Sequence, residues 1–98
     1  MKRMIRYKVK ADRAEENSEL VRAVYEELAS LRPAGLRYAT FKLDDAVSFV
    51  HIASIETADG RNPLADVAAF ARFQEGIGER CAEAPVTVEI EEVGSYGM

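Results

Sequence analysis

The sequence predicts an α+β fold of the ferredoxin-like type, a four-stranded antiparallel sheet with two helices on one face. Apolar residues alternate with polar ones in the first and last of four short segments, the period of a strand with one apolar face, and the third segment is apolar on both faces. Apolar residues recur at helical spacing after the first and third segments. The order is βαββαβ, and two βαβ halves with right-handed crossovers interleave into one sheet whose central strands are the first and third. We expect a single domain over residues 1–98.

The first strand and first helix are predicted from the amino-terminal third of the chain. The apolar face of the strand consists of Ile5, Tyr7 and Val9. Polar residues from Asp12 to Ser18 offer N-caps for the helix, and Pro33 and Gly35 end it. The helix stripe expected to face the core is formed by Leu20, Val21, Val24, Tyr25, Leu28 and Leu31.

The second and third strands are predicted to form a hairpin through a short turn at residues 44–46. The two strands span residues 36–43 and 48–55. In a tight hairpin Thr40 lies opposite His51 and Tyr38 opposite Ala53, so these four side chains share one face. A turn longer or shorter by one residue would change this pairing.

The third strand is apolar on both faces. Its apolar residues are Phe49, Ala53 and Ile55 on one side and Val50 and Ile52 on the other. A strand with one wet face alternates between apolar and polar residues, so this pattern requires cover on both sides. The helices shield one face, and we expect the other to meet a second subunit.

The second helix is predicted to start at Asn62, an N-cap, followed by Pro63 at the first helical position. Its apolar residues are Leu64, Val67, Phe70, Ala71, Phe73 and Ile77. The fourth strand follows Pro85, where Val86, Val88 and Ile90 alternate with Thr87, Glu89 and Glu91. Because it neighbours the first strand, we expect cross-strand ion pairs of Arg6, Lys8 and Lys10 with Glu89 and Glu91; two solvated charged rows are the alternative.

Composition excludes several classes of partner. The net charge of −4 argues against nucleic acid, and no apolar run is long enough to cross a membrane, so we expect a cytoplasmic protein. The lone Cys81 is expected to be a small apolar residue at a helix end. Turn chemistry explains the three loop aspartates, Asp44, Asp45 and Asp59, better than a cation site does. We therefore expect no metal.

His51 is the candidate catalytic residue. It is the only histidine, and an imidazole titrates near neutrality, so it could act as a general base or as a donor to a ligand. The candidate ligand-binding residues are Tyr38, Thr40, Tyr7 and Tyr25, since tyrosine pairs an aromatic ring with a hydroxyl. The alternative is that His51 and the tyrosines only pack in the core.

The chain from Arg6 to Tyr96 resembles the dimeric α+β barrel superfamily, and within it the small proteins of the antibiotic-biosynthesis-monooxygenase type. The resemblance is carried by the βαββαβ order, the two-faced third strand and the Asn-Pro-Leu start of the second helix at residues 62–64. It implies a homodimer in which the helix-free faces of two sheets close into a barrel. It also implies a cavity between each sheet and its own helices.

The site residues of better-known members do not carry over. The oxygenases of this superfamily use tryptophan and asparagine in the cavity, but this chain has no tryptophan, and Asn17 and Asn62 occur in helix-capping contexts. The haem-degrading members bind haem through a histidine on the second helix, where this sequence has none. We expect no cofactor.

Three functions remain open at this point. The first is a small-molecule enzyme or enzyme-like protein of the antibiotic-biosynthesis-monooxygenase type, oxidising an aromatic substrate without a cofactor. The second is a non-catalytic dimeric module that binds a small aromatic or apolar ligand. The third is a barrel that serves assembly alone. An RNA-binding domain of similar strand order is disfavoured, because only Phe49 fits its third-strand motif and the chain is acidic.

Overall fold

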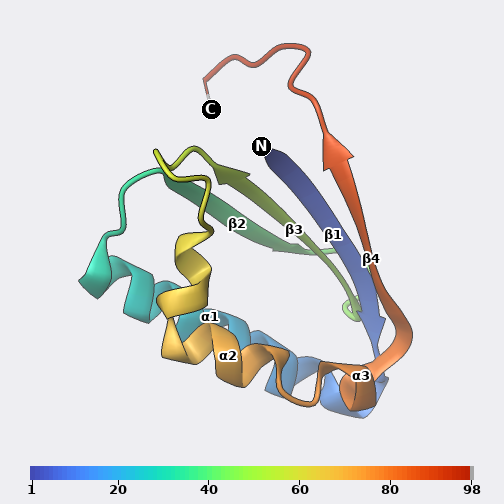
Figure 1. Ribbon diagram of the computed structural model, residues 1–98. Helices are drawn as coiled ribbons and strands as arrows, with labels where there is room; N and C mark the ends of the chain where they lie inside the picture. The colour runs from blue at the N-terminus through green and yellow to red at the C-terminus, as the bar shows by residue number, and fades with distance from the viewer. Residues whose placement is uncertain (98) are drawn as a thin grey trace.

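The computed structural model describes residues 1–97 and consists of one antiparallel sheet with its helices on one face (Figure 1). The sheet order β2-β3-β1-β4 confirms the predicted fold, with the first and third strands at the centre. The elements are β1 (Lys2–Val9), a 3-10 turn (Ala11–Arg13), α1 (Ala14–Leu31), β2 (Leu36–Lys42), β3 (Ser48–Ile55), a second 3-10 turn (Pro63–Asp66), α2 (Ala68–Gln74), α3 (Ile77–Arg80) and β4 (Cys81–Ile90).

The β2–β3 hairpin has the predicted register, in which Thr40 lies opposite His51 and Tyr38 opposite Ala53. The turn is held by Asp45, whose carboxylate accepts hydrogen bonds from the backbone N–H groups of Val47 and Ser48. This bonding is the turn chemistry expected of an aspartate. The hairpin therefore carries His51 toward the helices, on the same face as Tyr38 and Thr40.

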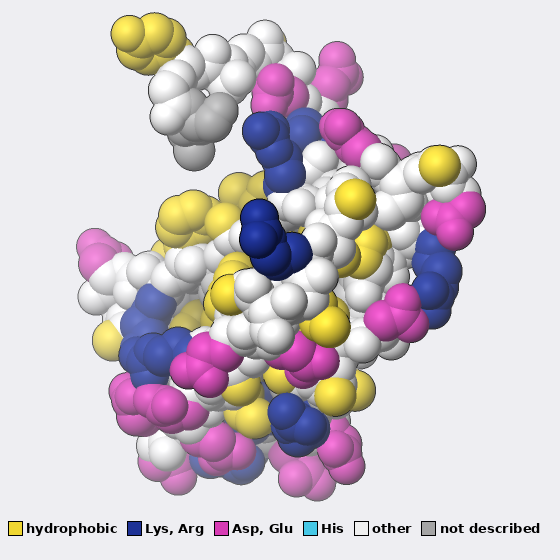
Figure 2. All heavy atoms as spheres, turned by 90° about the vertical axis from the view of Figure 1, so that its left-hand side faces the viewer, with side chains coloured by type: hydrophobic (Ala, Val, Ile, Leu, Met, Phe, Trp, Pro, Cys, Tyr) yellow, Lys and Arg dark blue, Asp and Glu magenta, His cyan; other side chains and the backbone are white. Residues whose placement is uncertain are grey.

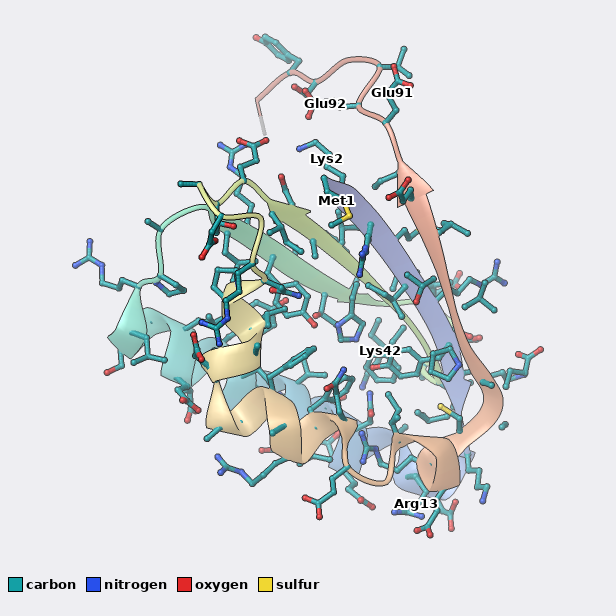
Figure 3. All side chains as sticks on the ribbon, in the orientation of Figure 1. Met1, Lys2, Arg13, Lys42, Glu91 and Glu92 are labelled. Atoms are coloured by element: carbon teal, nitrogen blue, oxygen red, sulfur yellow. The ribbon has the colours of Figure 1, made fainter. Side chains whose placement is uncertain are left out.

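The core lies between the sheet and the helices α1 and α2. Its buried apolar residues are Tyr7, Val9, Val21, Val24, Phe49, Leu64, Val67, Ala69 and Phe73. The rings of Tyr7 and Phe49, on neighbouring central strands, stack with centroids 5.5 Å apart. Side chains occupy the space between the sheet and the helices in Figure 3. Leu31 is an exception to the predicted stripe: it is 53% exposed, whereas Leu28, three residues earlier, packs against this core.

The second helix is not continuous, so the prediction of one helix from Asn62 onward is wrong. Asn62 caps as expected, since its side-chain oxygen accepts from Leu64 N at 3.0 Å, but the segment it starts is only a 3-10 turn. Val67 is then extended, and α2 begins at Ala68. The new start is capped by Glu27 of α1, whose carboxylate accepts from two backbone N–H groups of α2. Gly76, with φ of 73°, separates α2 from α3.

The predicted start of the fourth strand is also wrong, because β4 begins at Cys81 rather than after Pro85. An edge strand tolerates proline, and β4 is at the edge. The half-buried Cys81 lies where α3 ends, as predicted. Beyond Ile90 the described residues form a tail without helix or strand. This tail stands apart from the body in Figure 1 and again in Figure 2, and its Glu91 and Glu92 line a hollow with Lys2 (Figure 3).

The register between β1 and β4 differs from the expected charge pairing. The regular register from Lys2 to Arg6 places Arg6 opposite Val86, and an irregularity after Arg6 places Lys8 opposite Glu83. Glu89 instead faces Arg3. The predicted pairing of Arg6, Lys8 and Lys10 with Glu89 and Glu91 is therefore wrong.

The helix-free face of the sheet has apolar residues on all four strands, although β1 also places the charged Arg6 there. Cross-strand partners share a face, and two rows cross this one: Phe41, Val50, Arg6 and Val86, and Ala39, Ile52, Met4 and Val88. Phe41 is 51% exposed and Val86 61% exposed. Both faces of β3 are thus apolar, and the described chain covers only one. Elsewhere, on the side shown in Figure 2, charges of both signs alternate with small apolar areas.

Gly35 is required where α1 turns into β2. Its φ is 79°, and an added Cβ would lie 2.7 Å from the carbonyl oxygen of Glu56. We expect Gly35→Ala to lower the free energy of unfolding by about 2–4 kcal/mol, combining left-handed strain with a backbone clash. Gly60→Ala is the matched control, since Gly60 has φ of 74° but no heavy atom within 4 Å of that Cβ, and about 1–2 kcal/mol is expected. Equal losses in urea denaturation would contradict the clash.

Candidate functional site

A cavity of about 400 Å³ lies between the sheet and the helical segment from residue 62 to residue 77. This volume is in the range of sites for small organic molecules. The apolar part of the lining includes Ile5, Leu64, Phe70, Phe73 and Ile77. The polar groups are contributed by Arg3, Tyr7, Tyr38, His51, Asn62, Gln74 and Thr87. The cavity predicted between the sheet and its own helices is therefore present.

His51 lies at the inner side of this cavity and is only 3% exposed. It is two residues from both Phe49 and Ala53 on β3 and so shares their face, and the imidazole points toward the helices. Both ring nitrogens have partners. The Tyr7 hydroxyl is 2.8 Å from Nε2, while the Tyr38 hydroxyl is 2.6 Å and Thr40 Oγ1 3.1 Å from Nδ1.

The predicted site residues are all joined to this network, although not all reach the cavity. Tyr25, on α1, forms a hydrogen bond of 2.8 Å with Thr40 Oγ1, and its ring stacks on Tyr38 with centroids 5.4 Å apart. It lines a separate hollow with Pro33, away from His51. The cavity itself is lined by Tyr7, Tyr38 and His51.

Two polar residues behind the cavity, Asn17 and Arg80, belong to the network but were not predicted from the sequence. Asn17 is fully buried within α1, so its assignment as a helix cap is wrong. Its side chain donates to the Tyr7 hydroxyl at 2.9 Å and accepts from Arg80 Nε at 3.1 Å. A signal was present, because Asn17 shares a helix face with Val21 and Val24, and a polar residue in an apolar stripe requires partners.

Burial keeps His51, Tyr7 and Tyr38 uncharged near neutral pH. It lowers the pKa of His51 to about 4 and raises the pKa values of Tyr7 and Tyr38 well above their ordinary range. The imidazole is therefore neutral and both phenols keep their protons at pH 7. A neutral network of this kind is suited to hydrogen bonding with a ligand.

The cavity wall is rich in aromatic rings and carries positive charge. The His51 and Phe73 centroids are 5.3 Å apart, and Phe70 meets Tyr38 edge-on. Among the described residues that line the cavity, the cation is Arg3, and none is an aspartate or glutamate. Among residues 1–97, no cluster of three or more His, Cys, Asp or Glu could hold a metal ion. The wall suits a planar, apolar molecule bearing a polar oxygen.

Comparison with known proteins gives a result at the level of structure only. No protein-family model and no curated protein matches the sequence. Solved structures do match, among them one from Nitrosomonas europaea proposed to be an antibiotic biosynthesis monooxygenase, with a TM-score of 0.74, 19% identity, and coverage of 98% of this chain and 92% of that one. A Caulobacter crescentus structure of the same proposed class has a TM-score of 0.71, 16% identity, and coverage of 95% and 89%.

A further Nitrosomonas europaea structure, of unknown function, matches with a TM-score of 0.73, 10% identity, and coverage of 97% of this chain and 90% of that one. At these identities the comparisons establish the fold, and the predicted resemblance to structures of the antibiotic-biosynthesis-monooxygenase type is confirmed. The chain is an α+β protein of that architecture, with an aromatic cavity built around one buried histidine. Within residues 1–97, no helix is both long and apolar enough to cross a membrane.

The depressed pKa of His51 predicts a pH dependence of stability. The folded chain keeps the imidazole neutral down to a pKa of about 4, whereas in the unfolded chain it takes up a proton near its ordinary value of 6.5. Between these values the unfolded state binds more protons, so acidification favours unfolding. We expect the free energy of unfolding to fall by about 1–2 kcal/mol from pH 7 to pH 5 through this group, with the full contribution present only above pH 6.5.

Urea denaturation at several pH values measures this effect. His51→Gln is the control, because it cannot titrate while the carboxylates and the amino terminus still do. The loss of unfolding free energy attributed to His51 is the difference between the pH curves of the wild type and the His51→Gln variant. Parallel curves for the wild type and the variant would show that His51 is not held neutral by burial.

Proposed function

We propose that the protein binds a planar aromatic small molecule in the cavity beside His51, as a homodimer. The observation that carries the proposal is a cavity of about 400 Å³ whose wall combines aromatic rings with a histidine bonded to two tyrosine hydroxyls. The aromatic rings provide stacking surfaces, and the Tyr38 hydroxyl at the cavity wall provides a polar anchor.

A second candidate function is the oxidation of such a molecule by dioxygen without a cofactor. It is favoured by the structural likeness to proteins proposed to be antibiotic biosynthesis monooxygenases. In a reaction of this class an activated CH₂ group and O₂ give a C=O group and water. The engagement of both His51 nitrogens favours binding over catalysis, because a general base needs a free lone pair.

The binding proposal is tested with 1-indanone, a planar aromatic ketone that cannot donate a hydrogen bond. We expect Tyr38→Phe to weaken its binding about fivefold, measured by ligand-observed NMR titration, because one hydrogen bond is lost. Tyr25→Phe is the matched control: it removes a hydroxyl from the same network but outside the cavity, so affinity should be unchanged. Equal effects of both variants, or no binding to the wild type, would argue against the site.

The homodimer proposal rests on the apolar helix-free face. Ile52 is at its centre and is 37% exposed in the single chain, so a charge there is tolerated by the monomer but not by a dry interface. We expect Ile52→Asp to dissociate the dimer at micromolar concentration, seen by sedimentation velocity, while the chain stays folded. Leu31→Asp, at a 53% exposed apolar residue of α1, should leave the dimer intact. A wild type that sediments as a folded monomer would refute the proposal.

A further inference from the structure

The buried polar side chains form one continuous hydrogen-bonded chain from α3 to the cavity. It runs from Arg80 to Asn17, on to Tyr7 and then to His51, which contacts Tyr38. Arg80 is 2% exposed, Asn17 is fully buried, and Tyr7 is 2% exposed. In such surroundings every donor has to find an acceptor, because an orphaned one costs about 1–3 kcal/mol.

The donor–acceptor direction of each hydrogen bond follows from the chemistry of Arg80, the first member of the chain. A guanidinium has donors only, so the atom of Asn17 that faces Arg80 Nε is its oxygen. The amide NH₂ of Asn17 must then face Tyr7, and it donates to the phenol oxygen at 2.9 Å. Among the hydrogen bonds of residues 1–97, the acceptor for the proton of Tyr7 is Nε2 of His51, at 2.8 Å.

A neutral imidazole carries one proton. Because Nε2 accepts from Tyr7, that proton is on Nδ1 and is donated to the Tyr38 oxygen at 2.6 Å, with Thr40 Oγ1 at 3.1 Å as a second acceptor. The Tyr38 hydroxyl accepts from His51, so its own proton is not used in that bond and can be donated either to the neighbouring Thr40 Oγ1 or to a ligand oxygen. That proton is available to a ligand in the cavity, whose wall Tyr38 forms.

We propose that Asn17 and Arg80 are positioning residues that hold His51 as its Nδ1–H tautomer, so that the Tyr38 hydroxyl donates into the cavity and the site selects ligands with an acceptor oxygen. The ligand class is a planar aromatic ketone or the anion of an aromatic enol or acid. The ligand class rests on the proposed binding function, whereas the assignment of the tautomer does not depend on it.

The charge distribution supports an acceptor on the ligand. The Arg80 guanidinium donates to the backbone carbonyls of Glu75 and Phe73, and no carboxylate among residues 1–97 lies within ion-pair distance of it. Arg3, opposite Glu89 in the sheet, places a cation on the cavity wall itself, where the lining residues within 1–97 include no aspartate or glutamate. Among the described residues Arg80 is bonded to neutral acceptors, so its positive charge favours electron density on a ligand oxygen at the other end of the polar chain.

Since the chain has one histidine, its tautomer can be measured directly by a long-range ¹H–¹⁵N correlation spectrum of the ¹⁵N-labelled protein at pH 8, without any ligand. The expected wild-type pattern is a protonated Nδ1 and an unprotonated Nε2. A protonated Nε2 in the wild type would overturn the inference, whatever the outcome of binding experiments.

Asn17→Asp reverses the donor–acceptor direction of the hydrogen bond between Tyr7 and His51 without removing a contact. A carboxylate accepts from both Arg80 and Tyr7, so Tyr7 must accept from His51, and the proton is expected to move from Nδ1 to Nε2. Asn62→Asp is the matched control, because it places the same charge on the cavity lining but keeps its capping oxygen and touches no member of the chain. An unchanged tautomer in Asn17→Asp, or a changed one in Asn62→Asp, would contradict the positioning role.

The ligand class is tested by comparing 1-indanone with indane, which has the same ring system but no carbonyl. The wild type should prefer 1-indanone about fivefold, and Asn17→Asp should abolish this preference because the Tyr38 proton then turns to Nδ1. If neither compound binds, the proposed binding function fails while the tautomer result stands. If both bind equally to the wild type with Nδ1 protonated, the ligand class is wrong.

Discussion

The hydrogen bond between the Tyr7 hydroxyl and His51 Nε2 is the constraint on which the rest of the interior depends. It joins the two central strands at positions that are almost wholly shielded from water. A hydroxyl and an imidazole in such a place cost several kcal/mol unless their remaining groups are also bonded. Their partners come from α1 and β2, and through Asn17 the chain reaches α3. The core is thus organised around a polar chain that ties separate elements together.

The aromatic rings around these hydrogen-bonded polar side chains shield them together from water. Phe73 lies against His51 and beneath the Arg80 guanidinium, and Phe49 stacks on Tyr7. These rings exclude water, which lowers the local dielectric and strengthens each hydrogen bond. The same exclusion keeps the imidazole neutral, as its pKa of about 4 shows. Shielding and bonding are therefore two parts of one arrangement.

The sequence predicted the fold and the centre of the site because both depend on local periodicity. Side chains in the strands at 36–43 and 48–55 point alternately to the two faces of the sheet. A tight turn between these strands places Thr40 opposite His51, so the residues that face the helices could be predicted. Tyr7 could be placed on that face in the same way. Asn17 and Arg80 could not, because their partners are contributed by elements far away in the chain, and no local pattern records such a contact.

The boundaries of the second helix and the fourth strand were predicted wrongly for the same reason, because contacts between distant segments determine them. Periodicity predicted one helix after Asn62, but Glu27 of α1 caps a new start at Ala68, a contact across 41 residues. Similarly, Pro85 is a local reason to end a strand, but it is tolerated because tertiary pairing places β4 at the edge of the sheet.

The proposed dimer and the cavity depend on the same strand. His51 and Ile52 are adjacent in β3 and point to opposite faces, one into the polar chain and the other onto the apolar helix-free face. A second subunit on that outer face would restrict the backbone of the strand that carries His51. Distances such as the 2.6 Å between His51 Nδ1 and the Tyr38 hydroxyl depend on the β2–β3 register, which the same contact would hold. In a chain this short, the proposed assembly and the geometry of the candidate site would thus be coupled through one strand, because its two faces cannot move independently.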